Sequence, residues 1–184
     1  MSEPERNALR NITGQRYPYK GRVLDLRVDT VLFPSGSEKV REVVEHRPAV
    51  ALLPVDSDGR IILVSQYRHA VDEDILEIPA GLIEDGEDPM ETAIRELQEE
   101  TGYRPAHVEL VTEFYTSPGY STELIYLYYV TDFIKSKLPE DDDEYIKVKS
   151  FTVEEITALI KDGRIHDGKT IMACYWYMAN KAAQ

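Results

Sequence analysis

Cysteine is nearly absent from this chain, since Cys174 is the only one among 184 residues. One cysteine cannot form an internal disulfide, so we expect Cys174 to be a buried small side chain of a protein in the reducing cytoplasm. The four histidines, His46, His69, His107 and His166, are not spaced with cysteine or with one another as zinc ligands are. The sequence therefore predicts neither a disulfide scaffold nor a zinc site.

Basic residues and long apolar runs are also scarce. Lys and Arg number 21 against 34 Asp and Glu, a formal net charge of -13, and no basic cluster interrupts the acidic excess. We therefore expect no generic attraction to nucleic acid or to an anionic membrane. The apolar runs fall well short of the ~18 residues that cross a bilayer, and residues 1–16 lack the apolar stretch of a signal peptide. An anionic small-molecule ligand would need a local positive charge.

The N-terminal part of the chain predicts a β-hairpin. Arg22–Phe33 is rich in aliphatic and β-branched residues and ends at the turn Pro34–Ser37, after which Lys39–Glu45 is the returning strand. Two strands alone are only marginally stable in water, so this hairpin must dock on something. We expect residues 1–45 to be an N-terminal β region, a dimerisation element, and residues 46–184 to form the main domain.

The main domain predicts a mixed sheet covered by helices on both faces, an α/β fold. Two apolar runs flank an Asp-Ser-Asp-Gly turn, Ala49–Val55 and Ile61–Tyr67, which predicts a second hairpin. A helix is expected over Asp88–Thr101, with Asp88 as its N-cap and Gly102 at its C-terminal end. Later segments complete the pattern: strands at 109–116, 123–131 and 146–151, a helix from the capping box of Thr152 and Glu155 to Gly163, and a helix at 169–183.

Three carboxylates share one face of the helix expected over Asp88–Thr101. At 100° per residue Glu96, Glu99 and Glu100 fall beside the apolar stripe of that helix. Like charges at this spacing repel one another, so the cluster is unfavourable unless a cation compensates it. Mg²⁺ binds oxygen ligands of this type. The alternative for a bare Glu-x-x-Glu-Glu is a solvated acidic face.

The surrounding residues favour the metal site, because the segment GLIEDGEDPMETAIRELQEETGY resembles the Nudix box position for position. The matching residues are Gly81, Glu87, Arg95, Glu96, Leu97, Glu99, Glu100 and Gly102. Only Tyr103 departs from the family pattern, which usually has an aliphatic residue there. The resemblance implies a Nudix fold, an α/β/α sandwich with a mixed sheet, here with a small N-terminal β appendage.

The resemblance implies a metal site on the acidic helix. Glu96 and Glu100 would be direct ligands, joined by the backbone carbonyl of Ala80, and Glu99 would be a ligand directly or through water. The cofactor would be Mg²⁺, with Mn²⁺ as an alternative, and it would polarise a phosphoryl oxygen and orient the attacking water.

The resemblance also implies structural roles for the other residues of the box. Arg95 and Glu87 would pair and hold the loop against the helix. Gly81 and Gly102 would be present for backbone geometry.

The flanking segments are similar to the ADP-ribose pyrophosphatase subfamily. Pro118 lies 118 − 102 = 16 residues beyond Gly102, within Ser117–Glu123, where the subfamily has its marker proline. Gln66-Tyr67-Arg68 followed by Glu77–Gly81 is a second similarity, and Arg41–His46 is a third.

These similarities imply substrate-binding residues. The guanidinium of Arg68 would grip the pyrophosphate; the alternative is a surface salt bridge. Arg41 and Glu42 would hold adenine or its ribose from a partner subunit, although a strand edge with these residues is often simply solvated. Pro118 and Glu123 lie in the loop expected to contact the substrate.

The general base is expected either on the box helix or in a distal acidic loop. The candidates are Glu99 on the helix, and Asp142 and Glu144 in the run Glu140–Ile146. The subfamily favours the loop, and Glu144 is a further candidate metal ligand. A solvated loop is the alternative for this acidic run.

The expected activity is Mg²⁺-dependent hydrolysis of ADP-ribose to AMP and ribose 5-phosphate by a homodimer in the cytoplasm. One alternative is the same chemistry on another nucleoside diphosphate sugar or a dinucleotide. The other is a non-catalytic sensor that binds ADP-ribose and regulates a partner.

Overall fold

The computed structural model describes residues 11–136, 138 and 146–180, and the chain divides into two compact units. The smaller unit holds the N-terminal strands through Pro48 together with Tyr115–Leu124. The larger unit holds Ala49–Phe114 and the chain from Ile125 onward.

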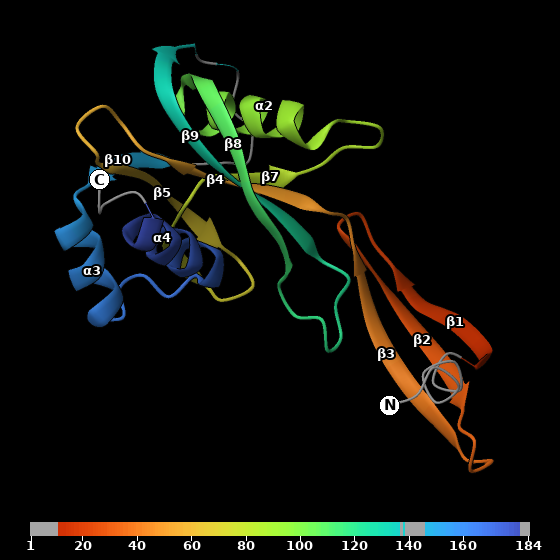
Figure 1. The fold of residues 1–184 in the computed structure, drawn as a ribbon. Coiled ribbons are helices and arrows are strands. Elements are labelled where there is room, and N and C mark those ends of the chain that lie inside the picture. Colours follow the sequence, from red (N-terminus) through yellow and green to blue (C-terminus); the bar gives the residue numbers. More distant parts are fainter. Residues whose placement is uncertain (1–10, 137, 139–145, 181–184) are drawn as a thin grey trace. The chain divides into compact units, whose positions relative to one another are not determined.

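The smaller unit is built on a three-stranded antiparallel sheet of order β1-β2-β3 (Figure 1). Its strands are β1 (Ile12–Lys20), β2 (Leu24–Leu32) and β3 (Glu38–His46). The predicted hairpin is present as β2 and β3. β1 was not predicted, because it is an edge strand with shifts in register and with Pro18 inside it. Edge strands tolerate proline and polar residues, so β1 lacks the apolar alternation of a buried strand.

The larger unit contains a mixed four-stranded sheet and a three-stranded sheet. The first has the order β7-β4-β9-β8, with β4 parallel to β9 and antiparallel to β7. The second has the order β10-β5-β6. The bounds are β4 (Ala49–Pro54), β5 (Ile61–Arg68), β6 (Glu73–Glu77), β7 (Ala80–Leu82), β8 (Tyr103–Tyr115), β9 (Leu124–Lys135) and β10 (Lys147–Phe151).

The predicted second hairpin is wrong in its pairing, although both of its strands exist. β4 and β5 belong to different sheets, and an isolated bridge joins Val55, just after β4, to Ile61. All six residues of β4 are buried, and so are the first four residues of β5. A continuous apolar run shows that a strand is buried but does not say which strand lies beside it.

Three helices flank these sheets: α2 (Pro89–Thr101), α3 (Val153–Lys161) and α4 (Gly168–Asn180). The predicted N-cap of α2 and the capping box of α3 are confirmed. Within the described ranges, no helix is long and apolar enough to cross a membrane. Cys174 on α4 is buried as expected, and burial raises the pKa of its thiol to about 12.

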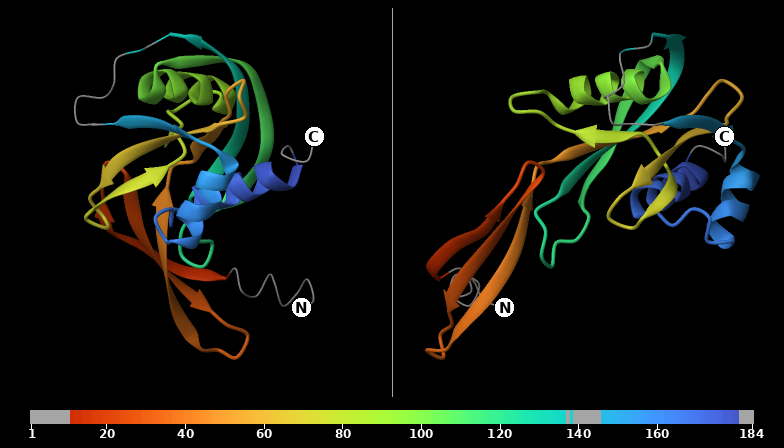
Figure 2. Two further views of the ribbon diagram at one scale, coloured as in Figure 1. Left: turned by 90° about the vertical axis from the view of Figure 1, so that its left-hand side faces the viewer. Right: turned by 180° about the vertical axis from the view of Figure 1, so that it is seen from behind.

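The two faces of β4 contact different helices, which confirms the predicted α/β/α arrangement (Figure 2). Val50 and Leu52 pack in one cluster with residues of α2. Ala51 and Leu53 pack in the other cluster, with residues of α3 and α4. The period-2 alternation of a strand thus places α2 over one face of the sheet and the two C-terminal helices over the other.

Candidate functional site

The helix α2 is fixed at both ends and along one side. The carboxylate of Asp88 accepts a hydrogen bond of 2.9 Å from the backbone N–H of Met90. Gly102 ends the helix with φ 75°, a left-handed conformation that favours glycine. Ala93 and Leu97 have no exposed surface. This anchoring holds the neighbouring stripe of carboxylates in a fixed place.

Glu96 lies directly against the backbone of β7. A Cβ atom added to Gly81 would stand 1.9 Å from Cδ of Glu96 and 2.2 Å from each of its carboxylate oxygens. Any other residue at position 81 would therefore force the Glu96 carboxylate to move. Ala80, the expected carbonyl ligand, precedes Gly81 and pairs with Ala51 of β4. The structure thus brings Gly81, the first glycine of the box, and Glu96 of its helix together.

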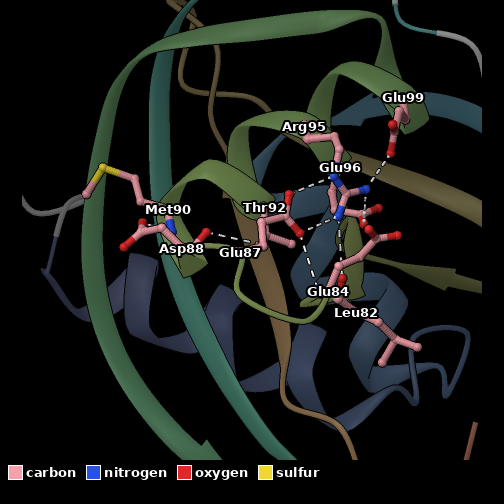
Figure 3. A network of polar contacts seen from close by, with 9 residues as sticks. All are labelled: Leu82, Glu84, Glu87, Asp88, Met90, Thr92, Arg95, Glu96 and Glu99. Atoms are coloured by element: carbon pink, nitrogen blue, oxygen red, sulfur yellow. Dashed lines mark hydrogen bonds and ion pairs between the residues drawn. The ribbon is translucent and has the colours of Figure 1, made fainter.

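Arg95 is the centre of a network of carboxylates (Figure 3). Its Nε and Nη2 donate to the two oxygens of Glu87 at 2.9 and 3.0 Å. This is the ion pair expected from the sequence, and it joins the loop to the helix. Nη1 also donates to Glu96 at 2.7 Å and to Glu99 at 2.9 Å. The sequence analysis did not foresee these two further contacts.

Glu87 and Arg95 hold each other in the charged form. The hydrogen bond from Arg95 lowers the pKa of Glu87 from its ordinary 4.5 to about 2. The same hydrogen bond raises the pKa of Arg95 above its ordinary value. The loop between β7 and α2 is therefore held by a pair that remains ionised at neutral pH.

The carboxylates of α2 supply oxygen ligands, the type that a hard divalent cation such as Mg²⁺ binds. Glu100 is only 4% exposed, and the Glu96 carboxylate occupies the space that Gly81 leaves open. Burial of several carboxylates is unfavourable unless cations compensate them. Among the described residues no three acidic, histidine or cysteine side chains already form a cage for a metal. Instead Glu96 and Glu99 converge on one cationic nitrogen, Nη1 of Arg95.

A second charged cluster surrounds Arg68, where β5 ends. Nε of Arg68 donates to Glu77 at 2.6 Å, and the Glu77 side chain is 2% exposed. Lys169 of α4 contacts the other oxygen of Glu77. The salt bridge that the sequence analysis named as an alternative is thus present, but its carboxylate is buried, while the Arg68 side chain is 39% exposed.

Sequence reasoning missed Glu77 and Lys169 as members of this cluster. The available signal was an acidic residue at the end of the apolar run Ile75-Leu76, immediately before Ile78. A buried carboxylate at such a position requires a cation, and the sequence offers no rule for choosing Lys169, 92 residues away.

The smaller unit holds the remaining candidates that the structure describes. The loop with Pro118 is tied to β3, since the Val44 N–H donates to Tyr120 O at 2.7 Å and the Thr122 N–H donates to Val44 O at 3.0 Å. Glu123 accepts a hydrogen bond of 2.6 Å from the hydroxyl of Thr116. The loop and the strand therefore form one module.

Arg41 and Glu42 lie on β3 and are exposed. The guanidinium of Arg41 lies 5.8 Å from the ring centroid of Phe33, a cation–π contact. Asp142 and Glu144 lie outside the described residues. Glu99 is the candidate base that the structure describes, and it is bound to Arg95.

Comparisons with known proteins agree on one family. The family model described as NUDIX domain matches residues 45–174. An ADP-ribose pyrophosphatase of Bacillus subtilis is 39% identical over 168 residues, 90% of this chain and 91% of the relative. A methanol dehydrogenase activator of Bacillus methanolicus is 40% identical over 166 residues, 89% and 90% of the two chains.

A solved structure described as an ADP compounds hydrolase has the same fold. Its TM-score is 0.83 at 21% identity, and the match covers 93% of this chain and 95% of that one.

Proposed function

The chain belongs to the Nudix family, and on that premise we propose that it hydrolyses the pyrophosphate bond of ADP-ribose in the presence of Mg²⁺. Water would be added across this bond to give AMP and ribose 5-phosphate. The observation that carries the proposal is the Glu96 carboxylate lying against Gly81, with Glu96 and Glu99 both bound to Arg95. The B. subtilis relative, matched over 90% of this chain, supports ADP-ribose as the substrate.

The box residues would hold the cation. The ligands would be Glu96, Glu100 and the carbonyl of Ala80, with Glu99 bound directly or through water. A bound Mg²⁺ or Mn²⁺ supplies positive charge that polarises a phosphoryl oxygen and acidifies water. Arg95 orients Glu96 and Glu99 through its hydrogen bonds.

Other residues would bind the substrate. Arg68 is the local positive charge that can grip the pyrophosphate against a net charge of -13. Arg41 and Glu42 would hold adenine or its ribose from the partner subunit. Pro118 and Glu123 would shape the loop beside the nucleoside.

The general base is proposed in the acidic loop, at Asp142 or Glu144, with Glu99 as the alternative. Loss of a base acts on kcat more than on substrate binding. Asp142→Asn and Glu144→Gln should be compared with Glu99→Gln across pH. If both loop variants stay within about threefold of wild type, an effect below roughly 0.7 kcal/mol, the base lies on α2.

Product analysis tests the proposed reaction. The purified protein is incubated with Mg²⁺ and a panel of nucleoside diphosphate derivatives: ADP-ribose, a nucleoside diphosphate sugar and a dinucleotide. Chromatography should show AMP and ribose 5-phosphate as the main products, with ADP-ribose turned over most efficiently. Faster turnover of another compound in the panel would support pyrophosphate hydrolysis but assign a different substrate.

A regulatory role is the second candidate, because one relative at 40% identity is named as an activator of a dehydrogenase. A pure sensor would bind ADP-ribose without turning it over. Calorimetric binding without product would favour this role. Clustered carboxylates on α2 favour turnover, since binding of an anionic ligand alone does not need them.

We also propose a homodimer in the cytoplasm, with residues 1–45 as the dimerisation element. Ile12, Tyr19 and Val40 of the three-stranded sheet are about half exposed or more, which supports a covering partner. The single buried cysteine needs no oxidising compartment.

A further inference from the structure

Glu77 is a buried carboxylate bound by two cations from different elements. Its side chain is 2% exposed, Arg68 Nε donates to Oε1 at 2.6 Å, and Nζ of Lys169 contacts Oε2. Removing one cation would leave a buried oxygen without its charged partner, which is costly. The end of β5, the end of β6 and the start of α4 are therefore linked through one carboxylate.

Lys169 is itself held in place. Its side chain is 13% exposed, and Nζ lies 3.2 Å from Oδ1 of Asp167. The other oxygen of Asp167 accepts hydrogen bonds from the N–H and the hydroxyl of Thr170. The hydroxyl oxygen of Thr170 accepts a bond of 2.9 Å from the N–H of Ile78. The network thus fastens α4 to the backbone two residues before Ala80.

An arginine and a carboxylate favour a bidentate pair in which two donors of the guanidinium face both oxygens. Lys169 occupies Oε2 of Glu77 and so opposes that arrangement, while Arg68 meets Oε1 through Nε. Without Lys169, the full charge of Glu77 would act on Arg68 alone. The guanidinium would then be drawn toward Glu77, and its attraction for an external anion would fall.

We propose that Lys169 is a positioning residue: by binding Glu77 it keeps Arg68 oriented for a pyrophosphate ligand. The inference rests on the proposed function, in which Arg68 binds the pyrophosphate. Lys169 is expected to act through Glu77 and Arg68 and not to touch the reacting phosphorus.

The test is a comparison of Lys169→Met, Lys169→Gln and Lys169→Arg. Lys169→Met should weaken ADP binding and raise KM for ADP-ribose by about tenfold, within the range of losses for supporting residues, with kcat changed little. Lys169→Gln keeps a hydrogen-bond donor for Glu77, and it replaces Lys169→Met in the comparison if that variant does not fold. Lys169→Arg should restore most of the affinity. The control, Lys161→Met at the exposed end of α3, should leave both constants unchanged.

A double-mutant cycle with Arg68→Met separates positioning from general stability. If Lys169 acts through Arg68, Lys169→Met should add no further loss of ADP affinity in the Arg68→Met background. Additive losses, or unchanged ADP affinity in the Lys169 variants, would overturn the inference. Calorimetry with ADP needs no turnover. If ADP binding depends on Lys169 but the wild-type protein does not hydrolyse ADP-ribose, the proposed function is refuted and the role of Lys169 in anion binding stands. If the wild-type protein hydrolyses ADP-ribose but does not bind ADP, or binds it independently of Lys169, the inference about Lys169 is refuted and the proposed function stands.

Discussion

Gly81 and Glu96 depend on each other, because the carboxylate of Glu96 fills the space where any other residue at position 81 would place its Cβ. Gly81→Ala should force Glu96 away from β7. Overpacking of this kind costs about 1–3 kcal/mol, and displacement of a proposed metal ligand should also lower turnover strongly.

Thermal unfolding and ADP-ribose turnover measure both effects of Gly81→Ala. Gly168→Ala is the matched control, since nothing lies within 4 Å of a Cβ added there. A Gly81→Ala protein with wild-type stability and turnover would contradict this prediction, because Glu96 could then occupy another position without loss of stability or activity.

The Glu87–Arg95 pair predicts a particular acid sensitivity. The pKa of Glu87 is lowered to about 2 in the folded protein from an ordinary 4.5. The stabilisation of the folded protein by this pair is therefore complete above about pH 4.5 and is lost as the pH falls toward 2. One such group contributes at most about 3 kcal/mol to the free energy of unfolding. Glu87→Gln should be less stable than wild type at pH 7, and the difference should shrink below pH 4.

Thermal midpoints between pH 3 and pH 7 measure this difference. Asp85→Asn, an exposed change in the same loop, should follow the wild-type curve. A constant gap between Glu87→Gln and wild type over the whole range would contradict the assigned pair.

At the residue scale, the sequence predicts the members of the box but not all of their contacts. The resemblance to the Nudix box implies that Glu87 and Arg95 pair, and the structure contains this pair. The additional bonds from Arg95 to Glu96 and Glu99 depend on side-chain rotamers that spacing does not specify. Lys169 was missed because its partner lies far away in the chain.

At the element scale, local signals predicted α2 and α3 well because caps are determined by neighbouring residues. Asp88 and Thr152 accept the backbone hydrogen bonds expected of N-caps. Strand pairing was less predictable: β4 and β5 were expected to pair and instead lie in separate sheets. Partner choice depends on contacts that are distant in sequence, such as those between β4 and β9.

At the scale of the whole molecule, the N-terminal β region carries the prediction of a homodimer. Deleting residues 1–45 should abolish both the dimer and activity, since exchange of such an element between two copies would bury it. Arg41→Ala should raise KM more than it lowers kcat, because it would touch the nucleoside and not the reacting phosphorus.

Light scattering at micromolar concentration measures the oligomeric state. A monomer with full ADP-ribose hydrolysis would refute the dimer and leave the family assignment intact. For the Arg41 variant, the kinetic constants should be compared with those of Lys39→Ala, another exposed cationic position on β3.

The carboxylates of α2 are proposed to hold the cation that drives pyrophosphate hydrolysis. The most direct test is ADP-ribose turnover by Glu100→Gln at saturating Mg²⁺, beside Glu91→Gln, an exposed change on the same helix. Glutamine fits a helix as well as glutamate does, so the fold should remain intact. Glu100→Gln should lose several orders of magnitude in kcat while Glu91→Gln keeps wild-type turnover. Near wild-type turnover by a folded Glu100→Gln protein would contradict the claim.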